Sequence, residues 1–188
     1  GYPQAAYQSA TLAMEVARQF AQPFNQALTV TYLAMLQEWL ADKATFRHYA
    51  EEAVGLSREY GAPYYAAWAS ILAAFARAWQ QPDHSHLALL QDAIEALTAT
   101  GARLRLPYYL SLLVRAHQRA GDLDGAMSAI ERAFGEALRN NERWWDGELH
   151  RLRGELLHAQ SADDADVETA LGRALEITRG QGAKSLEL

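Results

Sequence analysis

Apolar side chains recur along this chain at intervals of three and four residues, with polar side chains between them. This spacing places apolar residues on one face of a helix, whereas a half-buried strand would alternate every two residues. Ala, Leu, Glu, Gln and Arg, which all favour helices, are abundant. We therefore predict an all-α chain of about nine antiparallel helices. The predicted helices cover residues 3–20, 23–41, 43–60, 63–80, 84–100, 107–120, 123–139, 143–159 and 164–180.

The breaks between these segments carry residues that start or stop a helix. The five prolines, at positions 3, 23, 63, 82 and 107, fall where helices are predicted to begin. Proline suits the first turn because its missing N–H would be unpaired there anyway. Gly61, Gly101, Asn140-Asn141 and the pair Gly180/Gly182 follow the second helix of successive pairs. Glycine and asparagine tolerate the left-handed conformation that closes a helix, so they support these boundaries.

The second helix of each predicted pair carries an alanine at a fixed period. The five are Ala13, Ala53, Ala93, Ala133 and Ala174, spaced by 40, 40, 40 and 41 residues. Such a period is typical of arrays in which helix pairs stack, and we expect the small side chain to let a neighbouring helix approach closely. The prediction is a single fragment of a longer protein, residues 1–188. It contains a partial repeat 1–22, repeats 23–62, 63–102, 103–142 and 143–182, and the start of a further repeat at 183–188.

Composition narrows the possible functions. The 17 basic and 23 acidic residues give a net charge of −6, which argues against direct nucleic-acid binding by this fragment. There is no cysteine, which excludes thiolate zinc sites and favours a reducing, cytoplasmic setting. No run of about 18 apolar residues occurs, so we expect no membrane span. Phosphate-binding glycine loops and nucleophile elbows are also absent. We expect no cofactor, no metal, no catalytic residues and no enzymatic activity in this fragment.

Two acid–histidine spacings on the predicted helix 143–159 could indicate a polar pair or a metal site. Asp146 and His150 are four residues apart and can pair on one helix face. Glu155 and His158 match half of a di-iron carboxylate pattern, which needs a second such motif that the chain lacks. We interpret these residues as ordinary polar contacts.

The tryptophans fall on the predicted first helices of the pairs, at positions 39, 68, 79, 144 and 145. Their main interpretation is core and groove filling. The alternative is that one or two, such as Trp68 or Trp144, are exposed anchors for a partner.

The segment Ala120-Gly121-Asp122-Leu123-Asp124-Gly125-Ala126, followed by Ile130 and Ala133, resembles a tetratricopeptide repeat. In that family a Gly-Asp turn precedes a small residue, a large residue four positions later and a small one three beyond. The period here is near 40 residues, against about 34 in the family. The resemblance implies a right-handed α-α superhelix whose concave face binds a partner. Together with Trp68, it gives these candidate partner-binding residues: Tyr108, Ser111, Arg115, Gln118 and Arg151.

The last quarter, in residues 142–157, 174–177 and 181–188, is similar to the C-terminal repeat region of large bacterial signalling ATPases. In those proteins a P-loop ATPase core precedes the repeats, and a nucleotide-cyclase-like or DNA-binding regulatory domain is often attached. The resemblance implies that the repeats bind a regulator or restrain the ATPase. We therefore expect a protein–protein interaction and sensor module that controls an ATPase or a transcriptional or signalling output domain. Its partner would be a protein, a peptide or another domain of the same chain.

Three alternatives stay open at this point. A small effector could bind in an aromatic groove lined by residues such as Tyr65, Trp68 or Tyr109. An enclosed pocket would favour that hypothesis, and an open groove would favour a protein partner. A helical enzyme would need ionisable groups that converge in a buried cluster from several helices. Apolar faces exposed on the terminal helices could also join two copies as a homodimer.

Overall fold

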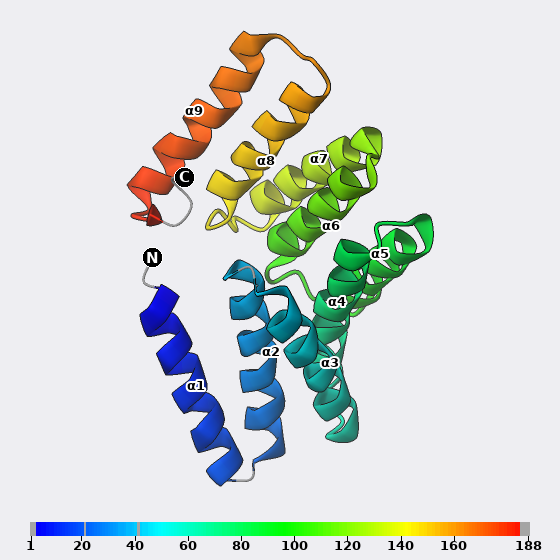
Figure 1. Cartoon of the computed structure of the whole chain (residues 1–188), viewed down its shortest axis with the longest axis vertical. Helices are drawn as coiled ribbons and strands as arrows, with labels where there is room; N and C mark the ends of the chain where they lie inside the picture. The colour runs from blue at the N-terminus through cyan, green and yellow to red at the C-terminus, as the bar shows by residue number, and fades with distance from the viewer. Residues whose placement is uncertain (1–2, 21, 41, 185–188) are drawn as a thin grey trace. The chain divides into compact units, whose positions relative to one another are not determined.

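The computed structural model describes residues 3–20, 22–40 and 42–184, and within these ranges every regular element is a helix (Figure 1). This confirms the predicted all-α class. The helices are α1 (Pro3–Gln19), α2 (Pro23–Trp39), α3 (Lys43–Glu59), α4 (Pro63–Gln80), α5 (His84–Ala99), α6 (Leu106–Ala120), α7 (Leu123–Arg139), α8 (Asp146–Ala159) and α9 (Asp164–Gly180). Most bounds lie within two residues of the prediction.

The start of α8 is the exception, because it begins at Asp146 and not at residue 143. Asn141 adopts a left-handed φ of 50°, and the Asp146 N–H donates to the Arg143 carbonyl at 3.2 Å, so the intervening residues form a turn. Trp144 and Trp145 therefore precede α8, and their predicted place on a helix is wrong.

The helices fall into two compact units, with α1–α5 in one and α6–α9 in the other. Within each unit, every helix packs against the next one in sequence. In addition, α2 contacts α4 in the first unit, and α6 contacts α8 in the second. Each unit is thus built from antiparallel helix pairs in which the first helices of successive pairs touch.

The two helices of a pair begin in different ways. Proline occupies the first turn of α2, α4 and α6. An aspartate caps each of α3, α5, α7 and α9, because its carboxylate accepts a backbone N–H that would otherwise be unpaired. The four caps are Asp42 to Thr45 N (3.2 Å), Asp83 to His86 N (2.9 Å), Asp122 to Gly125 N (2.9 Å) and Asp163 to Ala165 N (3.0 Å).

The helix ends repeat as well. Left-handed residues close α3, α5, α7 and α9, at Gly61, Gly101, Asn141 and Gly182, with φ between 50° and 86°. After three of these helices a backbone N–H reaches back five residues, as in Glu142 N to Ala137 O at 3.0 Å. This pairing satisfies a carbonyl that the helix leaves open. The predicted stop signals are confirmed, with Gly182 and not Gly180 as the left-handed residue of the last pair.

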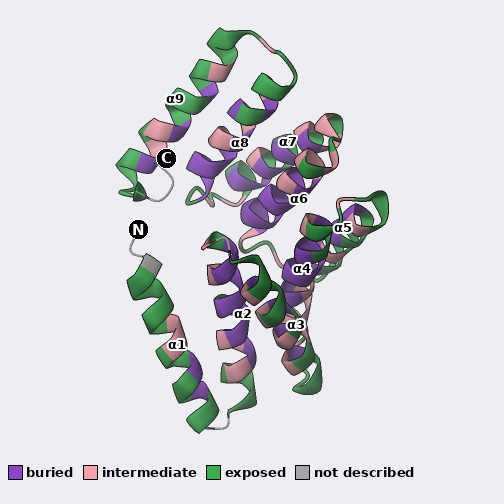
Figure 2. Cartoon of the chain, in the orientation of Figure 1, coloured by how far each residue is buried: buried purple, intermediate pink, exposed green. Residues whose placement is uncertain are grey.

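The helices carry both buried and exposed positions (Figure 2). The periodic alanines fall on both kinds and do not share one environment. Ala53, Ala133 and Ala174 are buried. Ala13 is exposed and Ala93 is half-buried, because the following residues, Met14 and Ile94, take the buried position in α1 and α5. The buried face is otherwise shared, because Leu90 and Leu97 of α5 are buried like the equivalent Ala50 and Ser57 of α3, so these helices differ only by a small rotation. The expectation of five equivalent alanines is wrong at these two positions.

Helices α8 and α9 approach each other closely at two glycines of α8. A Cβ added to Gly147 would lie 2.5 Å from Cγ2 of Thr178, and one added to Gly154 would lie 2.6 Å from Cδ2 of Leu171. Both distances are shorter than a normal carbon–carbon contact of about 3.5 Å. Here the close crossing depends on glycines of α8 as well as on alanines of α9.

Candidate functional site

The residues predicted for the concave face of α6 are covered. The hydroxyl of Ser111 accepts a hydrogen bond from Trp145 Nε1 at 2.9 Å, and the indole of Trp145 packs edge-on against Tyr108 at 5.3 Å. Tyr108 and Ser111 are 0% and 1% exposed. Their assignment as partner-binding residues is therefore wrong, because the turn before α8 lays Trp145 over this face. Arg115 and Gln118, further along α6, are half-buried.

Trp68 is also a core residue. Its side chain is 1% exposed and lies edge-on to Tyr32, with ring centroids 5.0 Å apart. Tyr64 and Tyr65 flank it at 6.5 Å and 6.2 Å. Its prediction as an exposed anchor is wrong, since aromatic rings of α2 and α4 pack around it. Trp144, the other suggested anchor, is 38% exposed and donates its indole N–H to Glu142 Oε1 at 2.7 Å.

Two of the residues suggested for an aromatic effector groove, Trp68 and Tyr109, are buried and belong to different units of the chain. Tyr65 makes an edge-on contact with Phe24 at 5.1 Å. These rings fill space within the units and do not line one binding site.

Arg151 is engaged within its own helix. Glu148 binds it in a bidentate manner, with N–O distances of 2.7 Å and 2.8 Å, and Glu155 pairs with a third nitrogen. Glu148 is buried, and its hydrogen bonds raise the pKa of Arg151. The guanidinium is thus neutralised in place, which reduces its capacity to bind a partner's anion.

Burial shifts the pKa values of two side chains on α8, Asp146 and His150. Desolvation raises the pKa of Asp146, even though Arg143 lies 3.1 Å away. Desolvation also lowers the pKa of His150, with the charges of Arg173 and other arginines acting in the same direction and Asp146 opposing them. The ion pair of Asp146 is with Arg143, not with His150 as its spacing suggested. Among the described residues, no group of three or more His, Asp or Glu is placed to hold a metal ion.

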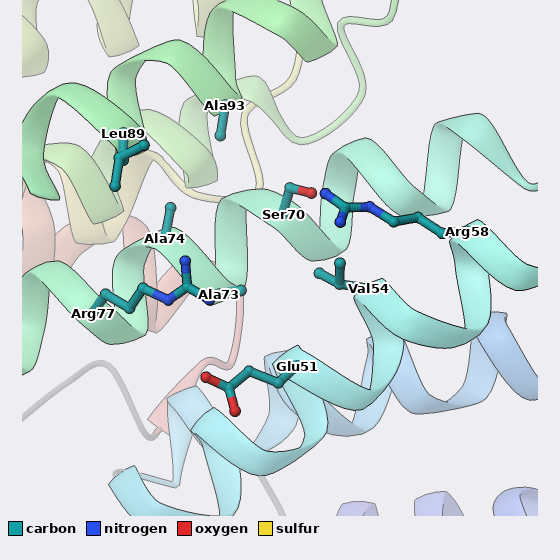
Figure 3. Close-up of a pocket in the computed structure, with 9 residues that line it drawn as sticks. All are labelled: Glu51, Val54, Arg58, Ser70, Ala73, Ala74, Arg77, Leu89 and Ala93. Atoms are coloured by element: carbon teal, nitrogen blue, oxygen red, sulfur yellow. The ribbon is translucent and has the colours of Figure 1, made fainter.

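A groove that was not predicted from the sequence lies between α3 and α5, with α4 as its floor (Figure 3). Its volume is about 510 Å³. The floor exists because Ser70, Ala73 and Ala74 are small and share one face of α4, together with Arg77 one turn further. The full lining consists of Glu51, Val54, Arg58, Ser70, Ala73, Ala74, Arg77, Leu89 and Ala93.

The walls of this groove combine exposed apolar and charged side chains. Leu89 of α5 is 48% exposed and faces the groove, and Val54 of α3 is half-buried. Arg58 extends from the last turn of α3 and Arg77 from the last turn of α4. In Figure 3 their guanidinium groups reach toward the floor from opposite ends, near Ser70 and Ala73. The site is therefore an open, amphipathic groove with a cation toward each end.

A second exposed apolar surface lies on α1, which packs mainly against α2 and reaches α3 through the Arg18–Glu52 ion pair at 3.4 Å. Leu12, Val16 and Phe20, spaced four residues apart, are 60%, 43% and 67% exposed. In the part of the chain that the structure describes, no helix is long and apolar enough to cross a membrane.

No family model matches the chain, and no solved structure matches it. The chain is similar to an uncharacterized protein of Rhizobium meliloti (strain 1021), with 32% identity over 100 residues. That similarity spans 53% of this chain but only 10% of the relative's length.

Proposed function

We propose that this chain is a tetratricopeptide-like interaction module that binds a protein or peptide within a larger cytoplasmic bacterial regulator. Its helix pairs would continue as a right-handed superhelix, and its partner would be a separate protein or another domain of the same polypeptide. The output it controls would be an ATPase or a transcriptional or signalling domain. The repetition supports this proposal: aspartate caps and left-handed closures recur about every forty residues along the second helices.

The observation that carries the binding role is the open groove between α3 and α5. Grooves formed by stacked helix pairs are the surfaces that repeat proteins commonly use for binding. The aromatic residues suggested for a small effector are instead packed against each other in the core. The similarity to a limited part of a longer bacterial protein fits a modular role. A protein partner is therefore favoured over a small effector.

The exposed row on α1 supports a second mode of association. Leu12, Val16 and Phe20 lie on one helix face, and contiguous apolar patches of this kind commonly mark interfaces. We include homodimerisation through α1 in the proposal. Light scattering of the chain, compared with a Leu12→Glu/Phe20→Glu variant, tests it, because the dimer would be lost only in the variant.

The binding role is tested by an unbiased selection. A phage library of random dodecapeptides is panned on the immobilised folded chain, and in parallel on an unrelated helical bundle as a control. The proposal predicts a consensus sequence enriched only on this chain, and saturable binding of the corresponding synthetic peptide. Absence of any enriched family would contradict it, as would peptides that bind the control equally well.

A further inference from the structure

Some arginines of this chain form ion pairs with carboxylates, and others do not. Among the described residues, several pair with carboxylates, including Arg18, Arg47, Arg139, Arg143, Arg151, Arg153 and Arg173. Arg58 and Arg77 do not, because neither side chain has a hydrogen-bond or ion-pair partner among the described residues. Both are exposed, and both line the α3–α5 groove.

The carboxylate of Glu51, which lines the groove, already has an arginine partner. Its Oε1 accepts from Arg47 Nε at 3.0 Å, and Arg47 is also held by Gln80 at 2.8 Å. Arg58 and Arg77 therefore keep their positive charge available to an incoming anion. The negative charge of Glu51 also disfavours a densely charged polyanion such as nucleic acid.

The spacing of the ligands follows from the points at which the two arginines enter the groove. Arg58 reaches the floor near Ser70 (Figure 3), and the backbone of Arg77 lies seven residues after Ser70 on α4. Seven residues of helix correspond to about 10 Å, which is the span available when the Arg77 side chain stands out from α4 to meet a ligand. An extended peptide rises about 3.3 Å per residue, so two side chains three residues apart span about the same distance. Neighbouring acidic residues would be too close to reach both ends.

The groove floor between the two arginines is apolar and is formed by short side chains. Ala73 and Ala74 form it, with Leu89 and Val54 on the walls. One apolar side chain of a ligand can cover Leu89, which is 48% exposed, and remove this area from water. Charge at the ends and apolar surface between them match a peptide better than a free ion.

We propose that the α3–α5 groove binds a short, extended acidic segment of a partner protein. One carboxylate pairs with Arg58, a second carboxylate three residues away pairs with Arg77, and an apolar side chain between them contacts Leu89. The planar guanidinium offers two parallel N–H donors to each carboxylate, which gives direction as well as attraction. This inference rests on the proposed interaction role and names the chemistry of its partner.

The test uses two phage libraries of octapeptides on the whole chain. One library fixes two glutamates three residues apart, the other fixes glutamines at the same places, and all other positions are random. The best peptide of the first library is then measured by fluorescence polarisation against wild type and variants. Arg58→Gln and Arg77→Gln should each weaken the Kd by about 3- to 10-fold and the double variant by about 10-fold or more. Arg132→Gln, at an exposed arginine of α7 outside the groove, is the matched control and should leave the Kd unchanged.

A steric variant separates groove binding from general charge attraction. Ala93→Leu fills the groove without changing charge, so it should weaken the same peptide by about 10-fold while the thermal midpoint stays near that of wild type. The inference is overturned by equal enrichment from the glutamine library, by no enrichment from the glutamate library, or by a Kd that the double arginine variant leaves unchanged. A non-acidic consensus from the unbiased selection would also overturn it while leaving the interaction role intact.

Discussion

Trp145 Nε1 donates a hydrogen bond to Ser111 Oγ at 2.9 Å and thereby fixes the turn before α8 on the buried face of α6. The Ser111 hydroxyl in turn donates to the Tyr108 carbonyl at 2.7 Å, so the chain of contacts ends within α6. Both Ser111 and Trp145 are buried. This contact explains why a face that resembles a binding groove in the sequence belongs to the core.

Replacement of Trp145 by Phe should destabilise the chain by about 1–2 kcal/mol, because it removes this hydrogen bond and leaves part of the indole volume empty. Trp144→Phe is the matched control. Trp144 is 38% exposed, and its acceptor Glu142 keeps the Arg105 N–H at 2.8 Å, so the loss should be under about 1 kcal/mol. Urea unfolding measures both. Equal losses for the two variants would contradict the role assigned to Trp145.

The contact between α8 and α9 gives a test of close packing. Gly147→Ala should cost about 1–3 kcal/mol, because the new methyl group meets the methyl of Thr178, a buried side chain held by the Ala174 carbonyl at 3.0 Å. Gly135→Ala in α7 has nothing within 4 Å of the added Cβ and should stabilise by about 0.5–1 kcal/mol. Opposite signs in thermal melts are the expected result. A neutral Gly147→Ala would show that the two helices are not this close.

The periodic alanines give a second packing test. Ala133 is fully buried, so Ala133→Leu should overpack α7 and destabilise by about 1–3 kcal/mol. Ala93 is half-buried at the edge of the α3–α5 groove, and Ala93→Leu should change stability by less than about 0.5 kcal/mol. The sequence alone predicts overpacking at both sites. Similar melting temperatures for the two variants would refute the difference in burial between the two alanines.

The ends of α6 and α8 allow a test of backbone conformation. Ser161 closes α8 with a left-handed φ of 57°, which costs a non-glycine residue about 1 kcal/mol. Ser161→Gly should therefore stabilise the chain by about that amount, as chemical denaturation can show. The reverse change, Gly121→Ala at the equivalent end of α6 with φ of 76°, should destabilise it similarly. Stabilisation by Gly121→Ala would rule out the left-handed turn.

His150 should make stability depend on pH. Its pKa is lowered from the ordinary 6.5 by burial, so its contribution to stability is fully present above that pH and is lost as pH falls through the folded-state pKa. Wild type should lose stability relative to His150→Gln as pH is lowered below 6.5. Asp146 has the opposite sign, because its raised pKa makes burial of the carboxylate most costly at higher pH. Urea titrations of the two proteins at several pH values measure the difference, and parallel curves would contradict burial of His150.

The all-α class and the helix boundaries were largely predictable because the local signals agree. Prolines mark the starts of α2, α4 and α6, and Gly61, Gly101 and Gly182 mark ends that only a left-handed residue can make. The site was not predictable to the same degree. Whether Tyr108 or Trp68 faces solvent depends on which rings from other helices cover them, and a period of forty residues does not specify helix rotation.

The groove between α3 and α5 left a weaker trace in the sequence. Ser70, Ala73, Ala74 and Arg77 share one face of α4, but small residues at this spacing equally predict a close helix contact. What distinguishes the groove is that Arg58 from another helix points into it without an acidic partner among the described residues. Which arginine has an acidic partner depends on how the helices pack, and the sequence does not reveal it.

The most direct test of the account is to titrate a peptide from the unbiased selection into the folded chain and follow backbone amide shifts by NMR. An interaction module predicts saturable shifts that cluster on one continuous surface, centred on α3, α4 and α5. If no selected peptide produced saturable shifts, the folded chain would have no peptide-binding surface, and the proposed interaction role would be contradicted.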